Sequence, residues 1–377
     1  MVHLASFEGN IGDKANHNGF YSALRSIDEL TFTITPLEIR KFYWKEKLFD
    51  QGFVDYVNQF DLLVIGGGNY FELWVEHSPT GTSIMIEPEL YKDITVPVVF
   101  NALGVDPGQG ASASACNKFR NFLDVIYTSG NSFVSIRNDG SMEALEQFIG
   151  KEYADRAVWT PDAGINVQCD DDFLGVTGDY LAVNLAGDML DVRFPEKEGY
   201  ISYDSFIEDI ARVIIHSLKD KQLEQVVLIP HIYKDLKCIN DLLEQLPDNV
   251  IRQQIIIAPL LNRADSEKKL FSIYKNAKLT LAMRFHANLC SIGLGVQTIG
   301  LANYRQIEQL YNELDLLDSY VGVNRLGFSD VLKEKISNLL ISKDSKERYE
   351  VVAKQQREMY SRYLKKLAIF FAKHIKV

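Results

Sequence analysis

The sequence predicts an α/β fold with two tandem, doubly wound domains. In the first half, the apolar run 61–65 ends in Gly66-Gly67-Gly68, and the run 96–100 is followed by Asn101 to Gly104. Short buried strands that end in glycine are typical of parallel sheets covered on both faces. Helical patterns alternate with these runs, as in doubly wound folds. A chain of 377 residues also exceeds the usual size of one hydrophobic core, so two domains are expected.

The first domain is expected at residues 1–165. Its predicted strands include 1–6, 61–65, 96–104 and 133–137, and its predicted helices are 12–26, 112–124 and 142–148. The segment 160–164 breaks the periodicity and indicates a domain joint.

The second domain is expected at residues 175–330, and a helical segment at 331–377. Predicted strands are 180–185, 225–231, 255–258, 278–282 and 297–301, with an amphipathic helix at 203–219. Two such domains imply a cleft between them, with ligands at the carboxyl ends of the strands.

Composition excludes several classes of protein. A net charge of -11 repels phosphate backbones, so nucleic acid is not an expected partner. The cysteines Cys116, Cys169, Cys238 and Cys290 form no CxxC pair and no Cys/His zinc spacing, so we expect reduced thiols and no metal. The start has no signal-peptide pattern, and no apolar stretch is long enough for a membrane span. We therefore expect a soluble, cytoplasmic protein.

The C-terminal tail is locally basic. Residues 360–377 mix apolar side chains with Arg362, Lys365, Lys366 and Lys373. Such a helix could lie on an anionic membrane surface, which would place the protein peripherally at the inner face of a membrane. Alternatively, its apolar face packs back on the domains and its cations face solvent.

Polar residues and glycines follow several predicted strands. Asn10 and Gly12 precede the first helix, where free amides favour anions and glycine lets the backbone approach a ligand. Asp13 is interpreted either as the N-cap of that helix or as a polar group at the cleft. Gly66, Gly67, Gly68 and Asn69 form a candidate phosphate or sugar cradle or a tight turn, without dinucleotide or P-loop spacing.

Two arginines and two histidines also lie at strand ends. Arg137 could bind a carboxylate or phosphate, or form a salt bridge to a neighbouring acid. Arg284 and His286 are two residues apart, so in extended backbone they would project to the same side. His231, at another strand end, could line the same cleft or have a structural role.

Taken together, these motifs resemble the polysaccharide pyruvyltransferase family. The resemblance runs from Asn10-x-Gly12-Asp13 through Gly66-Gly67-Gly68, Ser135-x-Arg137, Pro161-Asp162, Pro230-His231 and Arg284-x-His286 to Tyr304. Where the family usually has a lysine after this tyrosine, the chain has Arg305, which keeps the charge. Tyr304 and Arg305 are therefore expected to line the cleft with Asn10, Gly12 and the Gly66–Asn69 loop.

The resemblance implies a fold and a reaction. The fold would be like that of GT-B glycosyltransferases, with two Rossmann-like domains whose parallel sheets face each other across a cleft, the first for the acceptor and the second for the donor. The reaction would transfer a pyruvyl group from phosphoenolpyruvate to a sugar of a cell-surface polysaccharide or its precursor, as a ketal, without a further cofactor. The acceptor could be a free or a lipid-linked saccharide.

The resemblance also implies roles for individual residues. Arg137, Arg284, His286 and His231 would bind the donor, with His286 as the acid. Asp13 or Asp162 could take the proton of a sugar hydroxyl, since a carboxylate can act as a general base. Two other functions stay open: a GT-B glycosyltransferase that uses a sugar nucleotide, and a non-catalytic saccharide-binding protein of the same fold.

Overall fold

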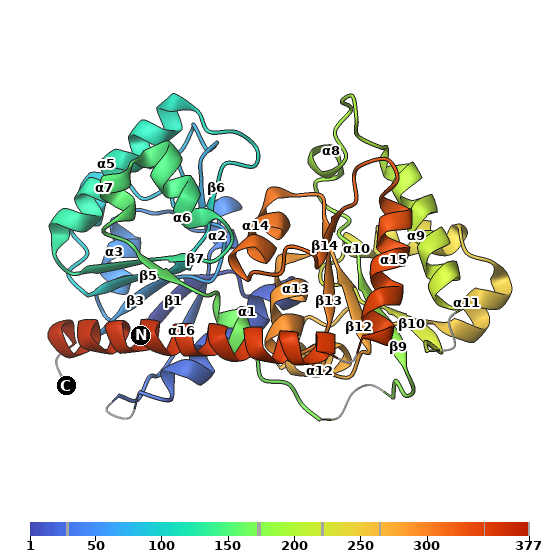
Figure 1. The fold of residues 1–377 in the computed structure, drawn as a ribbon. Helices are drawn as coiled ribbons and strands as arrows, with labels where there is room; N and C mark the ends of the chain where they lie inside the picture. Colours follow the sequence, from blue (N-terminus) through green and yellow to red (C-terminus); the bar gives the residue numbers. More distant parts are fainter. Residues whose placement is uncertain (28–29, 172–174, 220–221, 264, 343, 376–377) are drawn as a thin grey trace. The chain divides into compact units, whose positions relative to one another are not determined.

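The computed structural model describes residues 1–27, 30–171, 175–219, 222–263, 265–342 and 344–375 (Figure 1). By their contacts, these residues form two compact units. Unit 1 comprises Met1–Glu8, Phe20–Ala163 and Arg357–Val377, and unit 2 comprises Gly9–Gly19 and Gly164–Gln356. Each unit is built around one six-stranded parallel sheet.

The sheet of unit 1 has the order β2-β1-β3-β5-β7-β8, and all of its pairings are parallel. The strand order reverses between β1 and β3, so the loops after these two strands flank a switch point, where α/β sheets commonly bind ligands. The six strands are β1 (Val2–Ala5), β2 (Thr35–Glu38), β3 (Leu63–Gly66), β5 (Val98–Leu103), β7 (Ser132–Arg137) and β8 (Val158–Thr160).

Helices cover this sheet, and a small parallel pair of strands extends from it. Strands β4 (Phe71–Glu72) and β6 (Val105–Asp106) form the pair, with Glu72 opposite Asp106. The helices wholly within unit 1 are α2 (Arg40–Tyr43), α3 (Gln51–Val57), α4 (Pro88–Tyr91), α5 (Ala113–Ser129), α6 (Ser141–Ala144), the π-helical turn Leu145–Ile149 and α7 (Lys151–Ala154).

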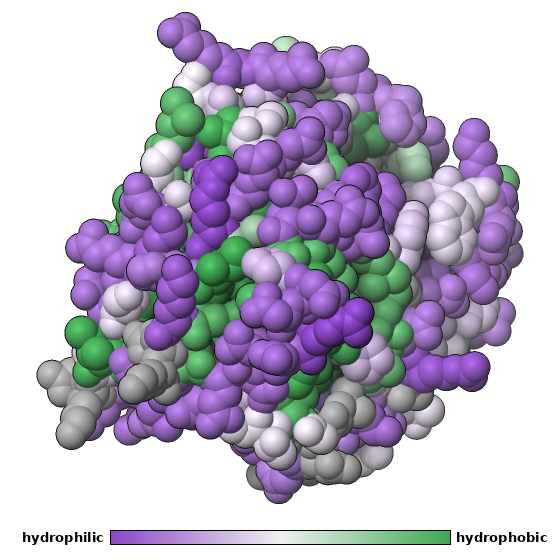
Figure 2. Space-filling model, turned by 90° about the vertical axis from the view of Figure 1, so that its right-hand side faces the viewer, coloured by the Kyte–Doolittle hydropathy of each residue, from purple (hydrophilic) through white to green (hydrophobic). Residues whose placement is uncertain are grey.

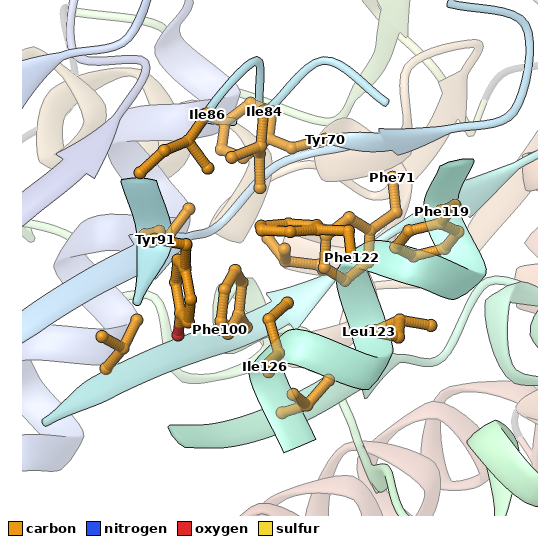
Figure 3. Packing of buried hydrophobic residues seen from close by; sticks show 14 of the residues in the cluster. Tyr70, Phe71, Ile84, Ile86, Tyr91, Phe100, Phe119, Phe122, Leu123 and Ile126 are labelled. Atoms are coloured by element: carbon orange, nitrogen blue, oxygen red, sulfur yellow. The ribbon is translucent and has the colours of Figure 1, made fainter. Parts of the chain in front are cut away.

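Several aromatic side chains pack against one another in the core of unit 1. Phe71 packs against Phe119 of α5, with ring centroids 4.6 Å apart, and Tyr91 of α4 meets Phe122 edge-on at 5.5 Å (Figure 3). Full burial of such rings removes large apolar areas from water, which is the main source of stability for a domain of this size.

The sheet of unit 2 has the order β11-β10-β9-β12-β13-β14, again fully parallel. In chain order this is 3-2-1-4-5-6, the order of Rossmann sheets, and the switch point lies between β9 and β12. The strands are β9 (Tyr180–Asn184), β10 (Gln225–Leu228), β11 (Ile255–Ile257), β12 (Leu279–Ala282), β13 (Thr298–Ala302) and β14 (Tyr320–Gly322).

Helices cover both faces of this second sheet. One apolar cluster joins α9, α10 and α15 to one face, and another joins α12, α13 and the start of α1 to the other. On the side shown in Figure 2, hydrophilic side chains predominate, with smaller apolar areas between them. The helices are α1 (Ile11–Leu24), the 3₁₀ turn Ala163–Asn166, α8 (Leu190–Arg193), α9 (Tyr203–Ser217), α10 (Asp235–Glu244), α11 (Asp248–Gln254), α12 (Ser266–Lys275), α13 (Phe285–Gly293), α14 (Arg305–Glu313) and α15 (Phe328–Ile341).

The last helix, α16 (Asp344–His374), packs its C-terminal part into unit 1. Tyr363 donates a 2.6 Å hydrogen bond to the buried Oδ1 of Asn101, and the ring of Phe371 lies 5.4 Å from that of Phe32. Tyr363 and Phe371 are buried, whereas Arg362 and Lys366 are exposed. Of the two alternatives for the tail, the structure therefore shows the packed helix. Peripheral membrane contact stays a prediction, and residues 376–377 lie outside the described part.

The units differ from the expected domain ranges in two places. Residues 11–19 of α1 belong to unit 2 although they precede most of unit 1 in the chain, and the C-terminal segment is divided between the units. Both differences arise from tertiary contacts that local composition does not reveal. Within the described ranges, no helix combines the length and the apolar character needed to cross a membrane.

We predict that Tyr363→Phe lowers the free energy of unfolding by about 1–2 kcal/mol. The change leaves the buried Oδ1 of Asn101 without its hydrogen-bond donor. Urea denaturation followed by circular dichroism measures the loss. Ser361→Ala, at an exposed position of the same helix, is the matched control and should change the free energy by less than about 0.5 kcal/mol. Equal effects of the two substitutions would contradict the prediction.

Candidate functional site

The polar residues of unit 2 gather where neighbouring strands end. Asp188 follows β9, His231 and Asp235 follow β10, and Arg284 and His286 follow β12. Because β9 lies between β10 and β12, parallel pairing brings these carboxyl ends to one edge of the sheet. The cluster therefore occupies the switch point between β9 and β12, the expected ligand position of a doubly wound sheet.

Asp235, the first residue of α10, connects three of these strand ends. Its Oδ2 accepts hydrogen bonds from the backbone N–H of His231 at 2.9 Å and from Nε of Arg284 at 2.8 Å. Its Oδ1 accepts from the backbone N–H of Gly187 at 3.1 Å and from Nη2 of Arg284. Asp235 is fully buried. This carboxylate fixes both the position and the orientation of the Arg284 guanidinium.

Arg284 shares a second carboxylate with another arginine. Its Nη2 lies 3.1 Å from Oδ1 of Asp188, and Nη2 of Arg193 lies 3.4 Å from the same oxygen. Burial alone would lower the pKa of Arg284, but the charges of Asp235 and Asp188 outweigh it and raise that pKa. For Arg193, burial is the larger effect and lowers the pKa, with Asp188 opposing it.

His286 is the second residue of α13 and lies in close contact with α1. A Cβ atom added to Gly12 would lie 2.8 Å from Cβ of His286, so only glycine allows this approach. Oδ1 of Asp13 lies 3.8 Å from Nδ1 of His286, and the histidine is 8% exposed. An acid and an imidazole are thus paired in a nearly closed environment, although the two residues lie far apart in the sequence.

One sequence-based expectation is wrong at this point, and one of two open alternatives is excluded. Arg284 has extended backbone, but His286 is already helical, so the two side chains do not follow strand alternation. The chain turns early because Nδ2 of Asn288 donates to the carbonyl oxygens of Ala282 and Arg284, both at 2.9 Å. Asp13 is not the N-cap of α1, because Oδ1 of Asn10 accepts the hydrogen bond from the N–H of Gly12 at 3.0 Å.

His231 is buried beside Arg284 and His286. Burial, with a smaller contribution from these two neighbours, holds the pKa of His231 well below its ordinary value, so the ring is neutral at pH 7. Its Nε2 lies 2.8 Å from the hydroxyl of Tyr274, whose pKa burial raises. The structural role that the sequence allowed for His231 is therefore present, and its place in a ligand cleft stays a prediction.

Tyr304 and Arg305 follow β13 at the same edge of unit 2. Tyr304 precedes α14, and its ring centroid lies 5.8 Å from the Arg193 guanidinium. The preceding residue, Asn303, accepts a 3.0 Å hydrogen bond from Nη1 of Arg193 at its Oδ1. Tyr304 thus adjoins the arginine cluster, and Arg305 begins the helix.

In unit 1, the glycine loop lies after β3, at the switch point of that sheet. A Cβ at Gly66 would collide with the backbone of Asn101, and Gly67 has a φ of 82°, so both positions need glycine. A Cβ at Gly68 would collide with the ring of Tyr70. Nδ2 of Asn69 donates a 2.6 Å hydrogen bond to Asp106. The loop is a tight, closely packed turn.

Arg137 and Asp162 form one buried ion cluster in unit 1. Nε of Arg137 donates to Asp139 at 2.7 Å, and Nη1 lies 3.7 Å from Oδ2 of Asp162. Burial disfavours the charge of Arg137, but Asp139 and Asp162 outweigh it and raise the pKa. The salt bridge that the sequence allowed for Arg137 is therefore present. Donor binding by Arg137 and a base role for Asp162 stay predictions.

Sequence reasoning missed a titratable carboxyl group next to this cluster. Burial, and to a lesser extent the charge of Asp106, raise the pKa of Glu72 to about 8. Ser83 donates a hydrogen bond to the carboxylate. The sequence around residues 71–72 did not indicate this carboxyl group, because its raised pKa depends on the pairing of β4 with β6.

The predicted site residues thus divide between the two units. Unit 2 brings together Asn10, Gly12, Asp13, His231, Arg284, His286, Tyr304 and Arg305, and unit 1 holds Gly66, Gly67, Gly68, Asn69, Arg137 and Asp162. Missed residues in unit 2 are Asp188, Arg193 and Asp235. Asp188 and Asp235 come soon after predicted strands, but this position does not show which loops become neighbours, and Arg193, at the end of α8, had no such signal. Among the residues that the structure describes, no group of three or more His, Cys, Asp or Glu side chains could hold a metal ion.

Solved structures identify the class of fold. UDP-GlcNAc 2-epimerase from Neisseria meningitidis, bound to UDP-GlcNAc, has a TM-score of 0.53 and 12% identity, with 97% of this chain and 100% of that chain covered. The spinosyn rhamnosyltransferase SpnG has a TM-score of 0.52 and 12% identity, with 97% and 100% covered. The fold is therefore GT-B-like, with two Rossmann-like units, as expected. The expected cleft between them stays a prediction.

A further match is the crystal structure of accessory secretory protein 1,2 and 3 in Streptococcus pneumoniae. Its TM-score is 0.48 at 12% identity, and the alignment covers 86% of this chain but 56% of that one. No curated protein has significant sequence similarity to the chain.

The family follows from the sequence itself. The model of the family described as polysaccharide pyruvyl transferase matches residues 10–304, which is most of the chain. The chain belongs to this family, as the resemblance of its motifs suggested. The matched range contains every residue of the His286 and Arg284 clusters described above.

We predict that Asp235→Asn lowers the free energy of unfolding by about 3 kcal/mol. Removal of one partner from a buried ion pair leaves the other charge uncompensated, here that of Arg284. Asp241→Asn breaks the partly exposed ion pair with Lys237 and should lower the free energy of unfolding by less than about 1 kcal/mol. Guanidinium denaturation of both variants measures the difference, and similar losses would contradict the proposed importance of Asp235.

We predict that Glu72 makes the free energy of unfolding fall between about pH 4.5 and pH 8. Its raised pKa means that the folded protein keeps a proton that the unfolded chain has released in this range, so stability is lost as pH rises. Glu72→Gln should reduce this decline by roughly 2 kcal/mol. This is less than the full pKa shift would give, because the side chain is partly accessible and solvent screens its charge. Denaturation at pH 5 and pH 8.5 tests this, with the exposed Glu89→Gln as control. An unchanged decline in Glu72→Gln would disprove it.

Proposed function

We propose that the protein transfers a pyruvyl group from phosphoenolpyruvate to a saccharide and forms a ketal. The observation that carries this proposal is the pairing of His286 with Asp13 directly beside Arg284, inside the range that matches the family. One titratable imidazole next to a fixed cation suits a reaction that needs both a proton donor and an anion-binding group.

The reaction has a balanced sequence of bond changes. Protonation of the methylene carbon of phosphoenolpyruvate makes its central carbon electrophilic, and a sugar hydroxyl then attacks that carbon. The bond from this carbon to the phosphate oxygen breaks, and a second hydroxyl closes the ketal. Of the two protons that the hydroxyls lose, one replaces the proton given to the methyl group and the other leaves with phosphate.

The unit 2 residues fit these steps. His286 gives the proton to carbon, and the carboxylate of Asp13 lies on its Nδ1 side. After that step, the neutral imidazole or Asp13 can accept the hydroxyl proton. Arg284, oriented by Asp235, binds an anionic group of the donor, and the neutral His231 adds a polar contact without adding charge.

For the acceptor, we propose a chemical class and no particular sugar. We propose a free or lipid-linked saccharide precursor, met in the cytoplasm, with no further cofactor. The exposed cations of α16, among them Lys365 and Lys366, would then support electrostatic contact with anionic lipid, beside the exposed side chain of Ile369.

The test is to incubate the purified protein with phosphoenolpyruvate and a panel of pyranosides and lipid-linked sugars. Phosphate release matched by a mass gain of one pyruvyl group in the acceptor would support the proposal. UDP-GlcNAc is the comparison ligand, since the epimerase of the same fold was solved with it. Binding of UDP-GlcNAc with no binding of phosphoenolpyruvate would favour the glycosyltransferase alternative.

We predict that His286→Gln lowers turnover at least about 100-fold while the fold is kept. Glutamine retains polarity and approximate size, but it does not deliver a proton near neutral pH. Phosphate release under saturating phosphoenolpyruvate measures the effect, and circular dichroism checks the fold. His216→Gln, exposed on α9, is the matched control. Turnover of His286→Gln within threefold of the unchanged protein would refute the acid role.

A further inference from the structure

Two guanidinium groups in unit 2 converge on a single oxygen atom. Nη2 of Arg284, at the end of β12, and Nη2 of Arg193, at the end of α8, lie 3.1 and 3.4 Å from Oδ1 of Asp188. Donors that approach one oxygen from two elements define a position for an oxyanion, because guanidinium groups match carboxylate and phosphate oxygens in geometry and charge.

The carboxylate at this position differs from the other carboxylate that Arg284 contacts. The side chain of Asp235 is 0% exposed and accepts backbone hydrogen bonds, so it is part of the core. The side chain of Asp188 is 23% exposed and adjoins the switch point. Solvent reaches Asp188, and a dissolved anion can therefore compete with it.

A buried amide beside Arg193 supplies independent support. Oδ1 of Asn303 accepts the hydrogen bond from Nη1 of Arg193 at 3.0 Å, which fixes the orientation of the amide. Asn303 is 5% exposed, and its Nδ2 has no hydrogen-bond partner among the described residues. A buried N–H donor without an acceptor is unfavourable, so a ligand oxygen at this place would satisfy it.

The local charges agree with such an exchange. Arg193 and Arg284 carry two positive charges, and Asp188 and Asp235 carry two negative charges, so the cluster is neutral as it stands. If the Asp188 carboxylate moves into solvent, one positive charge is exposed to the vacated position. An anion that enters then replaces one ion pair by another.

We propose that Arg193, Arg284 and Asn303 form an oxyanion subsite in which the Asp188 carboxylate holds the place of a ligand phosphate or carboxylate and is displaced when that ligand binds. The subsite itself follows from the cluster, and only its assignment to phosphoenolpyruvate rests on the proposed function. Tyr304, beside Arg193, would help to hold that arginine in position.

The alternative is an ion cluster that only stabilises the fold, and Asp188→Asn distinguishes the two. If Asp188 competes with the ligand, its neutralisation tightens anion binding. If Asp188 only positions the arginines, the same change weakens binding or leaves it unchanged. Asp188→Asn keeps size and polarity at a partly exposed position, so folding is expected to be preserved.

The experiment is isothermal titration calorimetry of the full chain with inorganic phosphate, pyruvate and phosphoenolpyruvate. We expect Asp188→Asn to bind the preferred anion roughly tenfold more tightly and Arg193→Gln to bind it roughly tenfold more weakly. Stronger binding of phosphate than of pyruvate would identify a phosphate subsite, and the reverse a carboxylate subsite. Thermal melting checks that each variant is folded.

The control is the ion pair of Asp209 with Arg212 on α9, in the same unit. Asp209→Asn and Arg212→Gln should leave the dissociation constants within twofold of those of the unchanged protein.

Unchanged or weaker binding by Asp188→Asn, or no anion binding at all, would overturn the subsite. Binding of inorganic phosphate but not of phosphoenolpyruvate would keep the subsite and refute the proposed donor. If Arg193→Gln binds phosphoenolpyruvate as tightly as the unchanged protein does, the subsite is refuted, whereas the proposed donor is retained.

Discussion

The arrangement of unit 2 depends on one buried carboxylate, that of Asp235. It joins the loops after β9, β10 and β12 through hydrogen bonds from Gly187, His231 and Arg284. Burial of a charge is unfavourable unless it is paired and fully hydrogen-bonded, and here every contact that compensates it comes from a strand end at the switch point. The geometry of the candidate site and the stability of the unit are therefore parts of the same network.

Both units contain an arginine between two aspartates, but solvent exposure gives the two clusters different properties. In unit 1, the side chains of Arg137, Asp139 and Asp162 are at most 3% exposed, so exchange with a dissolved anion would first require local opening. In unit 2, Asp188 remains accessible. An acidic protein can bind an anionic substrate in this way, because its cations are concentrated locally and stay balanced until the substrate arrives.

Much of the fold could be predicted from the sequence, because apolar runs that end in glycine mark parallel strands directly. Gly12, Asp13, Arg284 and His286 were also identified, since each follows a strand. Asp188, Arg193 and Asp235 were not, because their contacts join loops that only the order β10-β9-β12 makes neighbours. The helical position of His286 depends on side-chain hydrogen bonds of Asn288, which residue spacing does not encode.

The two units are interleaved along the chain, and this has a consequence for biosynthesis. Residues 9–19 belong to unit 2, while residues 357–377 complete unit 1. A ribosome therefore makes Asp13 long before its partner His286, and it makes Tyr363 after the rest of the unit 1 core. Domains usually fold as units during synthesis, N-terminal first. Here neither unit has all its parts until translation has passed well beyond its sheet, and unit 1 completes its packing only after the whole of unit 2 has been synthesised.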